Sequence, residues 1–345
     1  MNNLPIAVTV AVAFLITASL GFWLIPLMRR VKFGQTILDI GPRWHKNKQG
    51  TPTMGGIMFA IGITIGALAG IGMLVGGVGG VGYLIQTRSI LIIVLGLLIA
   101  LGFGFIGFID DYIKVVKKRN LGLSERQKLV MQFLLASVYI LALYINGSIS
   151  TRVSIPFLFQ IDLGLFYYPL AIAGIVYIIN VVNFTDGIDG LCTSVTFASA
   201  LGFLVIAGIL HNEGMAIMAG ALAGGSLGFL VWNLHPAKIF MGDTGSMYLG
   251  GMVVALAFGL GIPVFLIFLG IVYILEGLSV MLQTAYFKYT RKKYGEGRRI
   301  FKMSPIHHHF EMSGWSENKI VLAFTTVQLL ASAVAVYAIF KFFTY

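Results

Sequence analysis

Charged residues are scarce in this sequence: of its 345 residues, 11% are charged and 58% are hydrophobic. A soluble domain carries roughly 25% charged residues. The apolar residues form runs of about twenty, the length that a helix needs to cross a hydrocarbon layer of ~30 Å. The scarcity of charge therefore excludes an ordinary soluble domain. It predicts an all-α integral membrane protein that forms a single domain over residues 1–345.

Cysteine is also scarce, because Cys192 is the only one in the sequence. A single cysteine cannot form an intrachain disulfide, and it argues against a zinc site built on thiolates. The start of the chain lacks the positive segment of a signal peptide. Its first apolar run, Ile6–Met28, is too long for a signal peptide and ends at two arginines, which predicts a retained membrane span.

Ten apolar runs have the character of membrane-spanning helices. They lie at about residues 5–28, 54–75, 89–109, 129–146, 169–184, 193–210, 215–232, 246–261, 263–287 and 320–343. Of the 24 Lys and Arg residues, 21 fall in the loops that follow the odd-numbered runs. Because basic loops stay in the cytoplasm, this asymmetry predicts that both termini lie outside. The net charge of +11 therefore needs no nucleic-acid partner.

Two local patterns need separate interpretation. Residues 150–165 lie on the predicted outer side, and the alternating β-prone residues Val153–Phe159 predict a small β-hairpin there. The segment Gly102–Gly107 matches the G-x-G-x-x-G fingerprint of dinucleotide-binding proteins. It lies inside an apolar run rather than between a strand and a helix, so the match is accidental.

Acidic residues number only 13, and ten of them lie in the predicted cytoplasmic loops or at their edges. A carboxylate held at the hydrocarbon boundary costs free energy, which indicates a functional site. Three groups adjoin apolar runs: Asp110 and Asp111 end the third run, Asn183, Asp186 and Asp189 end the fifth, and Asp243 opens the eighth. All three groups belong to the same predicted side of the membrane.

The first group suits metal and phosphate chemistry. Adjacent helical residues point about 100° apart, so Asp110 and Asp111 are expected to perform different tasks, one near a metal and one near a proton to be removed. A basic strip follows that suits phosphates and equally anionic lipid headgroups; it contains Lys114, Lys118 and Lys128. The alternative is a helix end that simply reaches water.

Asp243 lies between glycines just before a predicted helix. This arrangement predicts a carboxylate beside free backbone N–H groups, which together can hold a hard cation and a phosphate. A simple helix cap is the alternative. In the most basic loop, His307, His308 and His309 can present N–H donors to a pyrophosphate, or they can belong to a solvated loop. The combined residues predict Mg²⁺-assisted phosphoryl transfer.

These groups closely resemble the motifs of the polyprenyl-phosphate N-acetylhexosamine-1-phosphate transferase family. The resemblance covers essentially the whole chain, and its most specific segments are 50–56, 110–112, 183–191, 240–246 and 305–311. It implies a ten-helix fold with periplasmic termini, a homodimer, Mg²⁺ as cofactor, and an active site on the cytoplasmic side of the bacterial inner membrane. Residues 51–55 and 307–311 favour the muramoyl-pentapeptide branch over relatives that use UDP-GlcNAc.

For that branch the resemblance implies the transfer of phospho-MurNAc-pentapeptide from UDP-MurNAc-pentapeptide to undecaprenyl phosphate, giving lipid I and UMP. Asp243 would coordinate Mg²⁺. The expected catalytic residues are Asp110, Asp111, Asp243, His307 and His308. The expected substrate-binding residues are Lys48, Thr53, Lys114, Lys118, Lys128, Asn183, Asp186, Asp189, Asn233, Phe240 and His309, with Phe240 stacked on uracil.

Two questions stay open at this point. Asp110 could deprotonate the lipid phosphate for a single displacement, or an aspartate could form an aspartyl-phosphate in a two-step reaction. A transporter is the rival from another class, and it would place ionisable residues near the bilayer midplane. Glu276 is the main acidic residue inside a predicted span, and the sequence assigns it no role.

Overall fold

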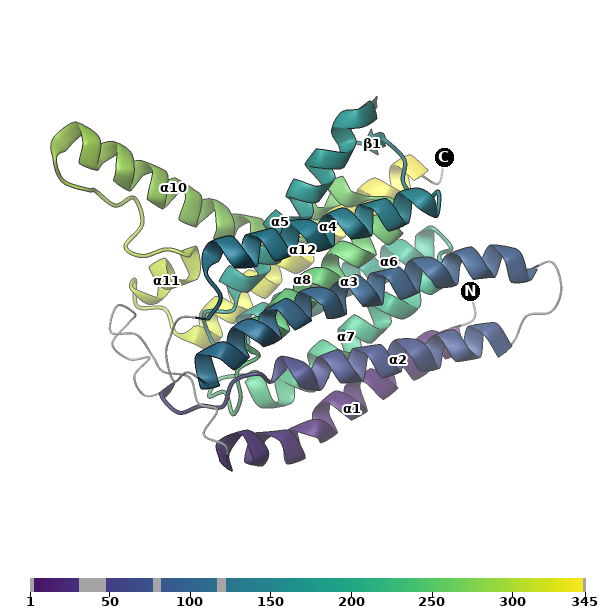
Figure 1. Cartoon of the computed structure of the whole chain (residues 1–345), viewed down its shortest axis with the longest axis horizontal. Coiled ribbons are helices and arrows are strands. Elements are labelled where there is room, and N and C mark those ends of the chain that lie inside the picture. Colours follow the sequence, from purple (N-terminus) through teal and green to yellow (C-terminus); the bar gives the residue numbers. More distant parts are fainter. Residues whose placement is uncertain (1–2, 31–47, 77–81, 117–121, 344–345) are drawn as a thin grey trace.

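The computed structural model describes residues 3–30, 48–76, 82–116 and 122–343, and helices dominate these ranges (Figure 1). The long helices are α1 (Asn3–Arg30), α2 (Gly56–Gly76), α3 (Gly82–Val116), α4 (Glu125–Ile145), α5 (Tyr167–Thr185), α6 (Leu191–Ile209), α7 (Glu213–Asn233), α8 (Gly242–Gly259), α10 (Ile271–Tyr294) and α12 (Glu317–Phe343). The shorter helical elements are η2 (Gly164–Phe166), η3 (Pro263–Phe265), α9 (Leu266–Leu269) and α11 (Ile306–Glu311).

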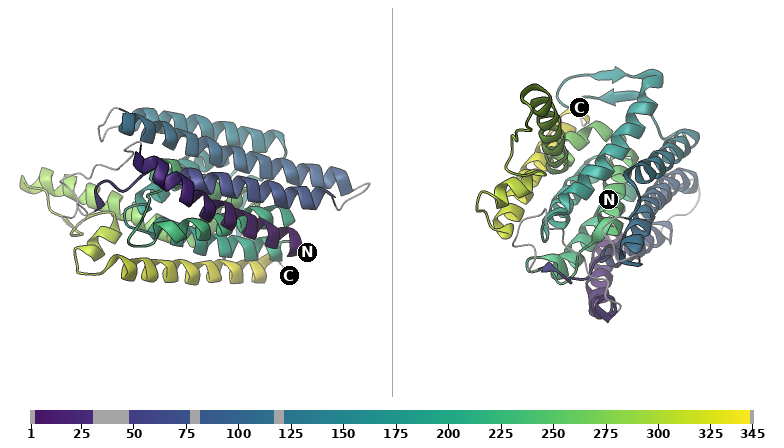
Figure 2. Two further views of the ribbon diagram at one scale, coloured as in Figure 1. Left: turned by 90° about the horizontal axis from the view of Figure 1, so that it is seen from below. Right: turned by 60° about the vertical axis from the view of Figure 1, so that its left-hand side comes forward.

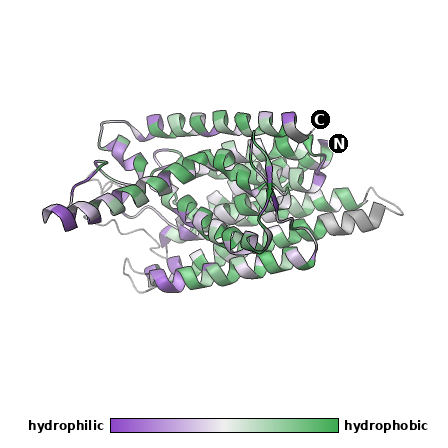
Figure 3. Ribbon diagram, turned by 90° about the horizontal axis from the view of Figure 1, so that it is seen from above, coloured by the Kyte–Doolittle hydropathy of each residue, from purple (hydrophilic) through white to green (hydrophobic). Residues whose placement is uncertain are grey.

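The predicted all-α membrane fold is confirmed. Among the described residues, eight helices are long and apolar enough to cross a membrane, and a bent pair would make a ninth. The remaining predicted run, 246–261, corresponds to α8, which lies in the centre of the bundle and is buried along most of its length. Apolar residues follow the helices and polar residues gather near their ends, as expected for a bundle whose solvent is lipid (Figure 3).

The predicted hairpin is confirmed, whereas one predicted span has a different shape. Strands β1 (Arg152–Ser154) and β2 (Gln160–Asp162) pair antiparallel, with Arg152 opposite Asp162. The run 263–287 was predicted as one apolar span, and the structure divides it into two helical segments. The chain breaks at Gly270, and the segments Pro263–Leu269 and Ile271–Tyr294 meet at 85°. Helix α10 therefore extends away from the bundle (Figure 1).

Small residues let the central helices approach closely, since lipid supplies no hydrophobic force to press helices together. Helix α7 carries glycines at every fourth position where it meets α1. A β-carbon on Gly224 would lie 2.3 Å from the carbonyl oxygen of Val10, and one on Gly228 would lie 2.6 Å from that of Phe14. The backbones themselves are in contact, so larger side chains would separate α1 from α7.

The two chain ends lie at the same end of the bundle (Figure 2). Helices α3, α5, α7 and α10 end at the opposite end, where α4, α6, α8 and α12 begin (Figure 1). The loops that carry the predicted site residues are therefore gathered at one end of the molecule.

Candidate active site

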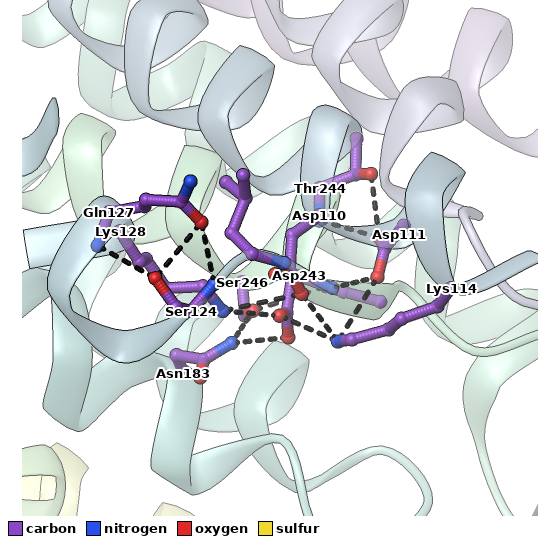
Figure 4. A network of polar contacts seen from close by, with 12 residues as sticks. Asp110, Asp111, Lys114, Ser124, Gln127, Lys128, Asn183, Asp243, Thr244 and Ser246 are labelled. Carbon is purple, nitrogen blue, oxygen red and sulfur yellow. Dashed lines mark hydrogen bonds and ion pairs between the residues drawn. The ribbon is translucent and has the colours of Figure 1, made fainter. Parts of the chain in front are cut away.

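Three carboxylates and two ammonium groups form a compact cluster, called here the acidic cluster (Figure 4). Asp110 and Asp111 end α3 and Asp243 begins α8, and one oxygen of each lies within 4.8 Å of the others. Lys114 Nζ is 2.6 Å from Asp110 Oδ2 and 2.9 Å from Asp243 Oδ2. Lys128 Nζ is 3.3 Å and 2.8 Å from the same two oxygens. The structure thus brings these five predicted site residues together.

Asp111 and Asp110 have different partners, as the helical spacing predicts. Asp111 Oδ2 accepts hydrogen bonds from the Thr244 amide at 2.9 Å and its hydroxyl at 2.7 Å, while Oδ1 accepts from the Asp243 amide at 3.2 Å. Asp110 Oδ1 accepts from the Leu123 amide at 2.8 Å, and its Oδ2 faces the lysines. The expectation of free amides beside Asp243 is therefore wrong, because Asp111 already accepts their hydrogen bonds.

Two further contacts fix the remaining members of the cluster. Asn183 Nδ2 donates to Asp243 Oδ1 and to Ser246 Oγ, both at 2.8 Å, so the second carboxylate oxygen of Asp243 is held from α5. Helix α4 begins with a capping box in which Ser124 Oγ accepts from the Gln127 amide at 3.3 Å. This cap fixes the first turn of α4, from which Lys128 reaches the aspartates.

Glycines bring the two backbones of this site into contact. A β-carbon on Gly107 would lie 2.1 Å from the Asp243 carbonyl oxygen and 2.6 Å from the Thr244 nitrogen. Gly242 has a φ of 70°, which L side chains rarely adopt, and a β-carbon there would lie 2.5 Å from Asp111 Oδ2. Close approach of α3 to α8 therefore depends on these two positions.

The acidic cluster fits a hard divalent cation. Carboxylate oxygens are the ligands that Mg²⁺ prefers, and three of them converge from two helices. The two lysines compensate this negative charge among the described residues, and they are also suited to phosphate oxygens. The predicted metal ligand Asp243 thus lies among groups suited to a divalent cation and to phosphate oxygens.

A second polar group lies around Lys48 and is called here the Lys48 cluster. Lys48 Nζ is 2.7 Å from Asp189 Oδ1 and 2.6 Å from Glu317 Oε2. Glu317 also accepts from the Asp189 amide at 3.0 Å. Asp189 Oδ2 lies 3.0 Å from His235 Nδ1 and accepts from the Ala237 amide at 2.9 Å. Three distant segments therefore meet at the buried residue Asp189: Lys48 and the 235–237 loop at its carboxylate, and Glu317 at its amide.

Glu317 and His235 were not assigned by sequence reasoning. Glu317 is the first residue of α12, where an acidic side chain is explained by the helix dipole alone. His235 precedes a proline in an irregular loop, outside any recognisable spacing. The sequence did contain a signal for Glu317, because this acidic residue adjoins the last apolar run. A carboxylate at the boundary of an apolar run was the feature that indicated Asp110, Asp111 and Asp243 as site residues.

Asp186 lies between the two clusters, at the end of α5. Burial raises the pKa of Asp186 well above its usual range, and the nearby charges of Asp243, Asp111 and Asp189 raise it further. The carboxyl of Asp186 therefore lies near enough to both clusters to be affected by the charges of their aspartates.

The predicted nucleoside residues lie at the junction of two loops. The Phe240 amide donates to the Pro52 carbonyl, and the Gly55 amide donates to the Phe240 carbonyl, both at 2.8 Å. Asn233 closes its own loop, because Nδ2 donates to the Ile239 carbonyl at 3.0 Å. Thr53 is buried at the same junction. The ring of Phe240 is half-buried there.

The three histidines differ in their surroundings. His307 is fully buried and its Nδ1 lies 3.1 Å from Glu276 Oε2, so the structure gives Glu276 a partner within the bundle. His308 is half-buried with Nδ1 2.6 Å from Glu311 Oε2. His309 Nδ1 accepts from the Lys302 amide at 3.1 Å. Lys118, the last of the predicted site residues, lies outside the described residues.

Comparison with known proteins places this site in a family. The model of glycosyl transferase family 4 matches residues 90–261, which carry the acidic cluster. The first signature of phospho-N-acetylmuramoyl-pentapeptide-transferases matches residues 48–59, which begin at Lys48. The fold and the site together define a multi-pass membrane transferase.

Curated relatives cover almost the whole chain. The phospho-N-acetylmuramoyl-pentapeptide-transferase of Halalkalibacterium halodurans is 46% identical over 95% of this chain and 96% of its own length. That of Geobacillus kaustophilus is 43% identical over 98% of both chains, and that of Clostridioides difficile is 41% identical over 96% and 97%. The chain belongs to the phospho-N-acetylmuramoyl-pentapeptide-transferase family, which confirms the resemblance found in its motifs.

Proposed function

We propose that this protein transfers phospho-MurNAc-pentapeptide from UDP-MurNAc-pentapeptide to undecaprenyl phosphate, giving lipid I and UMP, with Mg²⁺ as cofactor. The observation that carries the proposal is the acidic cluster, in which Asp110, Asp111 and Asp243 converge beside Lys114 and Lys128. The family relationship supports the identity of both substrates.

The acidic cluster performs the transfer. Mg²⁺ held by Asp243, with Asp110 close by, would neutralise charge on the phosphate oxygens. Lys114 and Lys128 attract the anionic phosphates and hold the two substrates together. Asp110 accepts the proton of the lipid phosphate, whose oxygen attacks the β-phosphorus. The bond from that phosphorus to the bridging oxygen then breaks, and UMP leaves with the bond's electrons.

The Lys48 cluster and the loop junction bind the nucleoside. Phe240 stacks on uracil, and Thr53, Asn233 and Asp189 surround the nucleoside. The described contacts of Asn183 hold Asp243, which links nucleoside binding to the metal. His308 and His309 face the pyrophosphate and the sugar from α11.

The distribution of charge supports a proposal for the cellular arrangement of the protein. We place the protein in the bacterial cytoplasmic membrane with the site on the cytoplasmic side, because 21 of the 24 Lys and Arg residues belong to loops at the site end of the predicted topology. We extend the family's homodimer to this chain as well.

A donor assay tests the proposed function. The purified protein, Mg²⁺ and undecaprenyl phosphate are expected to release UMP from UDP-MurNAc-pentapeptide, and omission of the lipid or addition of EDTA is expected to abolish release. UDP-GlcNAc is the matched alternative donor, and faster release from it would overturn the assignment. Donor labelled at the β-phosphate, given without lipid, should leave the protein unlabelled; a trapped aspartyl-phosphate would replace the single displacement by two steps.

A transporter is the alternative from another class of protein, and it predicts a different experimental result. Glu276 is fully buried and contacts His307 inside the protein rather than lining an open path. Uptake of intact nucleotide-sugar into proteoliposomes, without release of UMP, would favour a transporter over the proposed enzyme.

Glu317→Gln tests the Lys48 cluster. The substitution keeps the shape of the side chain but removes the charge that Lys48 and the Asp189 amide contact. A charged hydrogen bond contributes about 1.5–3 kcal/mol, so we expect UMP to bind roughly tenfold more weakly in calorimetry. Glu296→Gln is the control, because Glu296 is exposed and pairs only with Arg298 at 3.8 Å among the described contacts. Equal UMP affinity in the two variants would remove Glu317 from the site.

A further inference from the structure

Glu276 and His307 form a fully buried pair whose presence stability alone does not explain. Both side chains have 0% exposure, and Glu276 Oε2 lies 3.1 Å from His307 Nδ1 and accepts weakly from the His307 amide at 3.4 Å. Within the described residues, Glu276 Oε1 and His307 Nε2 have no hydrogen-bond partner. Replacing a buried polar pair by apolar residues is often neutral or stabilising, so the pair points to a role other than stability.

The edge of the His307 ring that carries Nε2 faces Gly187, in the turn between Asp186 and Asp189. A β-carbon on Gly187 would lie 2.1 Å from His307 Nε2 and 2.6 Å from Cε1. The imidazole therefore occupies the space where any side chain at position 187 would have to lie. Gly187 directly follows Asp186 and lies two residues before Asp189, the centre of the Lys48 cluster.

Glu276 determines which edge of the ring faces this turn. Nδ1 is the ring nitrogen that contacts the Glu276 carboxyl group, so Nε2 is the nitrogen left without a hydrogen-bond partner among the described residues. The pair spans from α10 to α11, and through Gly187 it reaches the end of α5. A rigid contact of this kind fixes a turn in the way that outer hydrogen bonds orient the ligands of a metal.

We propose that Glu276 and His307 are positioning residues that hold the Asp186–Asp189 turn, so that Asp186 faces the acidic cluster and Asp189 faces Lys48. The inference rests on the proposed function and deepens it. Neither side chain contacts the substrates, and neither transfers a proton. This gives His307 a supporting role and leaves His308 as the histidine that faces the pyrophosphate.

The decisive variant replaces the pair as a unit. In Glu276→Leu/His307→Leu, we expect kcat/KM for the nucleotide-sugar to fall about 10–100-fold and the Kd of UMP to rise, since the turn loses its support. The thermal midpoint in detergent is expected to stay at or above that of the wild type, because no buried charge is left unpaired. A merely structural pair would lower the midpoint and the activity together.

Two single substitutions keep the inference testable if the double variant fails to fold. Glu276→Gln retains an acceptor for Nδ1 and should stay within a few-fold of the wild type. Gly187→Ala forces the ring away and should weaken UMP binding as the double variant does. The control is Gln328→Leu, which removes another fully buried polar contact to α10, between the Val272 amide and Gln328 near the middle of α12.

The outcomes separate this inference from the function on which it rests. A wild type that releases no UMP with lipid phosphate and Mg²⁺ defeats the proposed function itself. A wild type that turns over, together with Gly187→Ala and the double variant at wild-type kcat/KM and UMP affinity, overturns the positioning role alone. A loss of UMP affinity in Gln328→Leu as large as that in Gly187→Ala would also overturn it.

Discussion

Asp243→Asn is expected to lower kcat by about 10³-fold and to abolish binding of a divalent cation. Asp243 is the carboxylate at which the whole acidic cluster meets: Asn183 donates to one oxygen, and Lys114 and Lys128 contact the other. Asparagine keeps the size of the side chain but removes the charge and presents an N–H₂ group to partners that are themselves donors. Turnover of UDP-MurNAc-pentapeptide and Mn²⁺ binding by electron paramagnetic resonance measure the two effects.

The matched control is Asp162→Asn. Asp162 belongs to the hairpin, at the opposite end of the bundle, and is exposed with Arg152 as a distant partner at 3.8 Å. It should leave kcat and Mn²⁺ binding unchanged. If Asp243→Asn bound Mn²⁺ as tightly as the wild type, the acidic cluster would not be the metal site. That result would contradict the proposed metal-assisted transfer at this cluster.

Gly107→Ala is expected to reduce activity by about 10²-fold although it adds a single methyl group. The added carbon would lie 2.1 Å from the Asp243 carbonyl oxygen, so α3 and α8 must separate. Overpacking of this kind costs about 1–3 kcal/mol, and it moves Asp110 and Asp111 away from Asp243. The thermal midpoint in detergent should therefore fall together with kcat.

Gly174→Ala is the control for this substitution. Gly174 also lies inside a membrane helix, but a β-carbon there would meet nothing within 4 Å. Alanine should stabilise that helix by about 0.5–1 kcal/mol, since glycine loses more conformational freedom on folding. Wild-type activity in Gly107→Ala would mean that the contact between the two backbones is not required for the geometry of the carboxylates.

The positions of the helices could be predicted because each apolar run and the charged residues that flank it are contiguous in the sequence. Nine of the ten apolar runs each correspond to one long helix, the run 263–287 corresponds to η3, α9 and α10, and the loops that carry the site residues lie at one end of the molecule. The break at Gly270 was not predicted, although it turns the ninth run by 85°. The two segments adjoin within one apolar run, and hydropathy contains no information about the angle at which two helical segments meet.

The chemistry of the site could be predicted in part for a similar reason. Asp110, Asp111 and Asp243 adjoin apolar runs, and the free-energy cost of holding a carboxylate there identified them as candidate site residues. Their hydrogen-bond partners could not be predicted from local sequence, because a bond such as that from the Asp243 amide to Asp111 joins residues 132 positions apart. The role of Glu276 depended in the same way on His307, which lies 31 positions further along the chain.

The shared position of the two chain ends has a practical consequence. Because both ends of the described chain, near Asn3 and Phe343, emerge at the far end of the bundle from Asp243, an affinity handle on either end points away from the substrates (Figure 2). Molecules captured by such a handle on a sensor chip or a nanodisc support would all present the reactive face to the flowing solution. Immobilisation and catalysis can then be measured on the same sample.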